Sequence, residues 1–219
     1  MFEFKIASKK FTIPQFAHEL TLGQFVKLRE KGLTVMEQLA IYCNVSADEL
    51  TFNYSDKANA QLRDAFVMAA LLNEDIKKYG SSAEKFITPK EVVILGKTIK
   101  IPQDLEKEPF WPSRKVKEIL EEQIKATGMN EDFDSTDKMA DVLAHYLYVP
   151  FTGMKYNEYR AEEFKEAIYD LPLTVAVPLS NFFFLQWKRL YLTKPRLFLV
   201  NFRLWRKKLA WKFSKTTGI

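Results

Sequence analysis

The sequence predicts a mainly α protein (α+β in detail), with a helical body, two short β-hairpins and a basic C-terminal helix. Three observations lead to this fold class. Apolar residues recur with helical spacing over most of the chain, Ser or Thr is repeatedly followed three residues later by Glu or Gln, and two short alternating segments end in proline. With 219 residues, 47% of them apolar, the chain is long enough to bury a core.

Both predicted hairpins show alternation of apolar and polar residues. The first pairs residues 2–6 with 11–13 across a turn at 8–10, and Pro14 ends its second strand. The second pairs residues 92–95 with 98–101 across Gly96-Lys97, since glycine at the first loop position suits a tight two-residue turn. We interpret the similar endings as two uses of strand-ending proline, not as an internal repeat.

The remaining predicted elements are helices. Capping boxes at Thr21, Thr34 and Ser46 predict short helices near 21–30, 34–43 and 46–52. A longer helix, with Leu62, Phe66, Ala69, Ala70 and Ile76 on its apolar face, should run over 56–79. Further helices are predicted at 113–127, 136–148, 157–169, 181–192 and from 195 onwards. We divide the chain into 1–80, 81–192, which should pack with the first part, and a C-terminal helix at 193–219.

Charge is distributed unevenly along the chain. Asp170 is the last acidic residue, and ten of the 33 basic residues follow it, together with ten aromatic ones. The last 49 residues therefore carry about +10, while 23 basic against 28 acidic residues leave the first 170 at about −5. A surface of one sign attracts its opposite, so this asymmetry predicts a large binding partner.

The predicted C-terminal helix has two apolar stripes, about 150° apart on a helical projection. Such a helix fits between two protein surfaces better than flat on a membrane. We predict that the partner is bound by Phe198, Phe202, Arg203, Trp205, Arg206, Lys207 and Trp211. Three alternatives stay open: a helix covered on both sides by its own chain, a nucleic-acid-binding arm, and a membrane-surface helix anchored by Trp205 and Trp211.

The sequence holds no compact catalytic signature. Its seven glycines form no phosphate loop or nucleophile elbow, and a single cysteine rules out both an internal disulfide and a Cys-x-x-Cys pair. We interpret Cys43 and His145 as packed residues. The acidic run of Glu131, Asp132, Asp134, Asp137 and Asp141 lacks the glycine and the final glutamate of a calcium loop. We therefore predict a non-enzymatic protein with no cofactor and no metal.

Several segments are similar to known proteins. The strings at 11–14, 19–25, 39–41 and 46–50 resemble the opening of small helical proteins from the structural modules of tailed phages, including phages of Bacteroidetes. Later segments share this resemblance, at 101–103, 110–111, 146–148, 160–162, 171–172 and 181–183. The family resembles tail-assembly-chaperone-like proteins, so the resemblance implies non-enzymatic assembly work.

These observations lead to one expected function. We expect a virion morphogenesis or structural protein that binds a tail, neck or portal component through its C-terminal helices, and the alternative is a nucleic-acid-binding virion protein. The sequence shows no signal peptide and no apolar run long enough to span a membrane, so we expect action in the host cytoplasm during assembly and possible presence in the virion. The opposite charges of body and tail also allow self-association.

Overall fold

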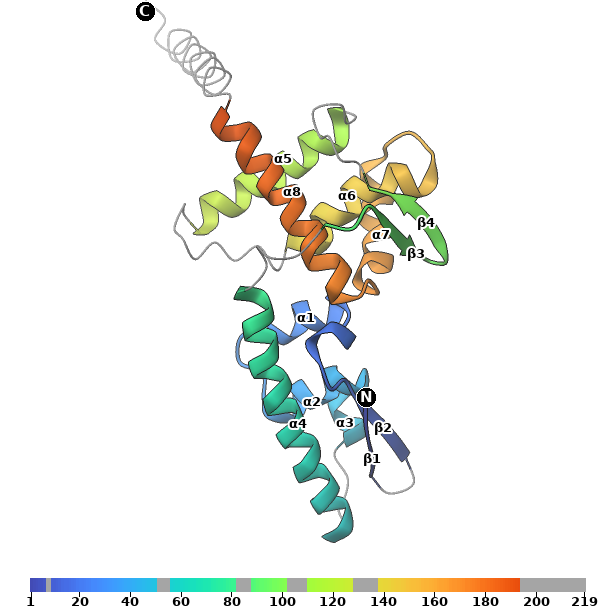
Figure 1. The fold of residues 1–219 in the computed structure, drawn as a ribbon, viewed down its shortest axis with the longest axis vertical. Helices are drawn as coiled ribbons and strands as arrows, with labels where there is room; N and C mark the ends of the chain where they lie inside the picture. Colours follow the sequence, from blue (N-terminus) through green and yellow to red (C-terminus); the bar gives the residue numbers. More distant parts are fainter. Residues whose placement is uncertain (7–8, 51–55, 82–87, 102–109, 128–137, 194–219) are drawn as a thin grey trace, which may run out of the picture. The chain divides into compact units, whose positions relative to one another are not determined.

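A computed structural model describes residues 1–6, 9–50, 56–81, 88–101, 110–127 and 138–193 (Figure 1). The chain divides into two compact units, Met1–Asn181 and Phe182–Ile219. The described residues are mostly helical, with two small antiparallel sheets of two strands each, which confirms the predicted mainly α class. The predicted basic C-terminal helix lies outside the described residues.

The first hairpin forms as predicted. Strand β1 (Phe2–Ile6) pairs with β2 (Lys9–Ile13), and Phe4 lies opposite Phe11. The alternation buries one face of the hairpin, because successive side chains of a strand point to opposite sides. The rings of Phe4 and Phe11 stack on this buried face, with their centroids 5.5 Å apart.

The second hairpin differs from the prediction in its turn. Strands β3 (Glu91–Ile94) and β4 (Lys97–Lys100) pair Ile94 with Lys97, so the loop is Leu95-Gly96 and the predicted Gly96-Lys97 turn is wrong. Both loop residues have positive φ, 48° and 75°, as a type I′ turn requires. A register shifted by two residues buries the same face, so the alternation alone could not choose between the two turns.

Three short helices follow the first hairpin: α1 (Leu22–Leu28), α2 (Val35–Cys43) and α3 (Ala47–Leu50), after a 3-10 turn η1 (Ala17–Glu19). The capping boxes at Thr21 and Thr34 are both present, with side-chain and backbone bonds in both directions. Gln24 has a second role, because its Nε2 also donates to the carbonyl oxygens of Ile41 and Tyr42. The start of α1 is thereby joined to the end of α2.

Helix α4 (Asp56–Ser81) packs one face against β1, β2, η1 and α2. Its buried residues are Leu62, Ala65, Ala69, Leu72 and Ile76. The predicted apolar face was therefore partly wrong, since Ala70 is exposed and Phe66 is half-buried. At the far end of the packed face, Asp75 accepts a hydrogen bond of 2.9 Å from the backbone N–H of Ala17.

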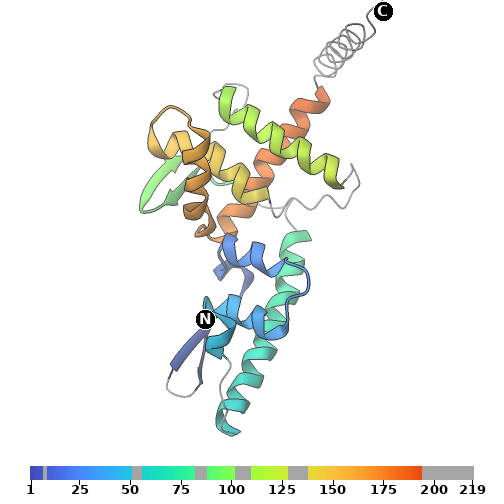
Figure 2. The ribbon, with the colours of Figure 1, turned by 180° about the vertical axis from the view of Figure 1, so that it is seen from behind.

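Helices α5 (Phe110–Thr127), α6 (Met139–Thr152) and α7 (Glu158–Tyr169) form the next layer, with α6 packed against both of the others (Figure 2). Helix α6 continues through Pro150 to Thr152, four residues beyond the predicted end at Tyr148, and is followed by a left-handed Gly153. Nearly all of its residues from Met139 to Tyr148 are buried. Asn157 caps α7, where its side chain accepts from the N–H of Arg160.

The last described helix, α8 (Leu173–Thr193), starts eight residues before the predicted start at Asn181. The predicted start leaves Pro178 and Ser180 outside the helix, but both lie inside α8, where the Ser180 hydroxyl donates to the carbonyl of Ala176. The start is set by a tertiary contact. The N–H of Leu173 donates to Leu20, and the N–H of Leu22 donates to Leu171, each at 2.8 Å. Residues 20–22 are thus paired with 171–173.

Candidate functional site

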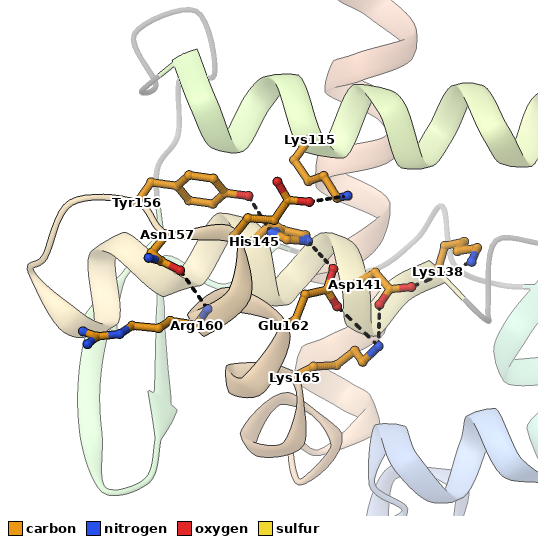
Figure 3. Close-up of polar contacts among 10 residues, drawn as sticks. Lys115, Lys138, Asp141, His145, Tyr156, Asn157, Arg160, Glu162 and Lys165 are labelled. Carbon is orange, nitrogen blue, oxygen red and sulfur yellow. Dashed lines mark hydrogen bonds and ion pairs between the residues drawn. The ribbon is translucent and has the colours of Figure 1, made fainter.

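The most developed polar cluster in the described residues surrounds His145 on α6 (Figure 3). The imidazole is fully buried. Its Nδ1 lies 2.8 Å from the hydroxyl of Tyr156, in the loop before α7, and its Nε2 lies 3.2 Å from Oε1 of Glu162 on α7. A carboxylate only accepts hydrogen bonds, so we assign the proton of a neutral ring to Nε2, and the Tyr156 hydroxyl then donates to Nδ1.

Lysine–carboxylate pairs surround the histidine. Lys165 of α7 lies 2.9 Å from Asp141 of α6 and also contacts Glu162. Lys115 of α5 lies 2.7 Å from Glu158 at the start of α7. The cluster therefore connects α5, α6 and α7 through side chains of opposite charge (Figure 3).

Burial and pairing shift the pKa values of these groups in different directions. Burial lowers the pKa of His145, and the nearby Glu162 carboxylate opposes this only in part. Burial raises the pKa of the Tyr156 hydroxyl. The hydrogen bond between Lys115 and Glu158 raises the pKa of Lys115 and lowers that of Glu158. In the same way, the hydrogen bond to Asp141 raises the pKa of Lys165. The stable form at neutral pH is thus a neutral imidazole among charged pairs.

The polar network around His145 holds α7 in position against α6. Both nitrogens of His145 are occupied by protein groups, and its ring is closed to solvent, so the imidazole has no open position for a substrate. The network satisfies the buried polar ring and positions α7 on α6, as expected of a buried polar group with all its partners. The interpretation of His145 as a packed residue agrees with this arrangement.

The predicted partner-binding residues Phe198, Phe202, Arg203, Trp205, Arg206, Lys207 and Trp211 all lie outside the described residues. Of the acidic run, Asp141 alone is described, and it is paired with Lys165 and Lys138. Within the described ranges, no three His, Cys, Asp or Glu residues are grouped so that they could hold a metal ion. Among the same residues, none of the helices has both the length and the apolar character needed to cross a membrane.

The sequence reasoning missed the partners of His145. Tyr156 and Glu162 follow it by 11 and 17 residues, and neither spacing belongs to a recognised motif. A usable signal did exist. The position of His145 on a highly apolar helix requires a hydrogen-bonding partner from a neighbouring element, and the next helix is rich in carboxylates.

Cys43, at the end of α2, is half-buried, so the interpretation of this cysteine as a packed residue holds only in part. Burial raises the pKa of its thiol to about 12, which keeps it protonated at neutral pH. The side chain therefore behaves as a small apolar group, as expected of an unreactive cysteine.

Comparison with known proteins gives no match: no family model fits the chain, and neither the curated proteins nor the solved structures contain a significant relative.

Proposed function

We propose that this protein is a non-enzymatic morphogenesis or structural protein of a tailed-phage particle. It binds a tail or neck component through its C-terminal segment, with the contact made by Phe198, Phe202, Arg203, Trp205, Arg206, Lys207 and Trp211. The resemblance of the segments at 11–14, 19–25 and 46–50 to tailed-phage structural proteins supports the class of function.

The observation that carries the proposal is the separation of charge along the chain. The last 49 residues carry ten basic and ten aromatic side chains and no carboxylate. Arginine and large aromatic side chains are the usual anchors of protein interfaces, because they bury a large area and add directional contacts. A basic segment also speeds the encounter with an acidic partner.

The experiment is a capture from expressing or infected cells, treated with nuclease, in which the full-length protein is compared with a 1–194 truncation. Mass spectrometry identifies the bound proteins. Tail or neck proteins that are retained by the full-length chain and lost from the truncation would support the proposal. Equal recovery of partners by both chains would refute it, because the contact would then lie in the body.

A charge-reversal variant sharpens this experiment. Arg203→Glu, Arg206→Glu and Lys207→Glu together should abolish capture. The matched control reverses three exposed lysines of the described body, Lys27, Lys31 and Lys155, and so changes the net charge by the same amount. If both variants lose the partner equally, net charge and not the C-terminal segment controls binding.

The same composition favours a second candidate function, a virion protein that binds nucleic acid. Interleaved basic and aromatic side chains can contact phosphates and stack on bases. Binding to single-stranded DNA should then weaken steeply with added salt, because each neutralised phosphate releases counterions. Loss of every captured component on nuclease treatment would favour this function over the first.

A further inference from the structure

The outer face of α4 is the feature of the described residues that the proposed function does not use. In Figures 1 and 2, α4 lies beside α2 and the first hairpin, and no described element covers its other side. Two large apolar residues lie on that side one turn apart, Val67 and Leu71, with 59% and 60% of their surface exposed. Two exposed apolar side chains one turn apart give a second helix an apolar surface on which to pack.

The neighbouring residues would allow another helix to approach closely. Ala60 and Ala70 are exposed and lie on the same side of α4 as Val67 and Leu71. Small side chains let two helix axes come within about 8–10 Å of each other, so that the larger residues of one helix pack over the small ones of the other. The stripe from Ala60 to Leu71 therefore has the shape of a helix-packing surface.

The charges on this stripe indicate which partner fits. Three exposed charged residues flank the stripe: Arg63 near one end and Glu74 near the other lie on one edge, and Asp64 lies on the opposite edge. If two copies of α4 pack antiparallel about a two-fold axis between Met68 and Ala69, Arg63 of each copy faces Glu74 of the other. The same axis places Val67 against the small Ala70. A parallel pair would instead bring each of these residues level with its own copy, so Arg63 would not meet Glu74.

We propose that the outer face of α4 is a self-association surface, on which a second copy of the chain packs its own α4 in antiparallel orientation. Such an interface is isologous, because the same stripe serves both partners, and so it closes as a dimer. The area of one helix pair is small, so we expect an equilibrium between monomer and dimer and not a permanent complex.

The test is sedimentation velocity of the full-length protein over a concentration series, after removal of nucleic acid. We expect a reversible dimer. Leu71→Glu should raise its dissociation constant by about tenfold or more, since a carboxylate in the centre of an apolar contact is poorly tolerated. The matched control is Val93→Glu, because Val93 on β3 is 59% exposed but lies on another surface, and this variant should dimerise normally.

The orientation has its own test. Arg63→Glu and Glu74→Arg should each weaken the dimer, and the double variant should recover it. The two residues are eleven positions apart on one helix, roughly 16 Å, so they do not meet within a chain and recovery reports a contact between chains. A monomer at every concentration would overturn the proposal, as would a dimer insensitive to Leu71→Glu. A dimer lost only on removal of 195–219 would assign self-association to the basic segment instead.

Discussion

At the scale of single residues, His145 shows how a polar group is tolerated in an apolar helix. Its ring is fully buried, and both of its nitrogens have partners on or next to α7. An unpartnered buried imidazole would lose its hydration with no compensation, whereas here each lost water contact is replaced by a protein contact. His145 therefore contributes to the packing of α7 on α6 as well as to the core.

His145 should make the stability of the protein depend on pH. Its pKa in the folded state is lowered from 6.5, so as pH falls below 6.5 the unfolded chain takes up a proton that the folded chain does not. The stability contributed by the neutral ring is therefore present above pH 6.5 and decreases as the solution becomes more acidic. At high pH, His145→Gln should cost about 1–3 kcal/mol of unfolding free energy, because it disrupts a buried hydrogen-bond network.

Urea unfolding on both sides of pH 6.5 checks this expectation. The difference between wild type and His145→Gln should shrink on the acidic side. His18→Gln serves as the control, because it makes the same replacement at an exposed histidine. A constant difference at all pH values would show that the titration of His145 has no effect on folding.

At Leu95, the natural residue is not the one that stabilises the β3–β4 turn most. It has φ of 48° in the β3–β4 turn and is 71% exposed, so it adopts a left-handed conformation without burying its side chain. Asn-Gly is the preferred pair for a type I′ turn, and Leu95→Asn should therefore stabilise the protein by up to about 1 kcal/mol. Denaturant unfolding would measure the gain. Val93→Asn, on the adjacent strand, should have the opposite sign, since Asn is disfavoured in extended structure.

At the scale of elements, the contact between α1 and α7 depends on a glycine. A Cβ added to Gly23 would lie 3.1 Å from Cβ and 3.3 Å from the carbonyl oxygen of Tyr169. The two helices approach closely because this position has no side chain. The paired backbone hydrogen bonds between 20–22 and 171–173 lie next to this contact, so the two features together join the beginning of α1 to the segment between the end of α7 and the start of α8.

Gly23→Val should therefore destabilise the protein by about 1–3 kcal/mol through overpacking against Tyr169. Lys27→Val introduces the same β-branched residue at an exposed position of α1, and should cost less than about 1 kcal/mol, as its helix propensity indicates. Thermal unfolding of the two variants makes the comparison. Equal losses would mean that the close contact with α7 does not require glycine at position 23.

At the scale of the whole molecule, the buried apolar residues whose side chains the structure describes extend to Phe183. All of them except Phe183 lie in the unit Met1–Asn181. We therefore expect the 1–194 truncation to unfold cooperatively, with a urea midpoint and slope close to those of the full-length protein. A large loss of stability would show that residues 195–219 form part of the core, and would remove the basis for treating them as a binding segment.

The sequence predicted correctly those element boundaries that depend on residues close together in the chain, and misplaced those that depend on contacts between distant residues. Helices α1, α2 and α7 begin where a nearby side chain caps them, at Thr21, Thr34 and Asn157, and these local signals are readable from the sequence. The start of α8 was misplaced because it depends on hydrogen bonds between residues about 150 positions apart. Pro150 and Pro178 both lie inside helices, so neither proline marks the start or the end of a helix in this fold.

The sequence by itself determined the mainly α class, the first hairpin, the capped helix starts and the charge asymmetry, because each of these follows from neighbours a few residues apart or from composition. The tertiary structure alone decided the register of the second hairpin, the start of α8, the partners of His145 and which face of α4 no described element covers. These depend on which distant segments meet in the fold, and a pattern of three to four residues carries no information about that choice.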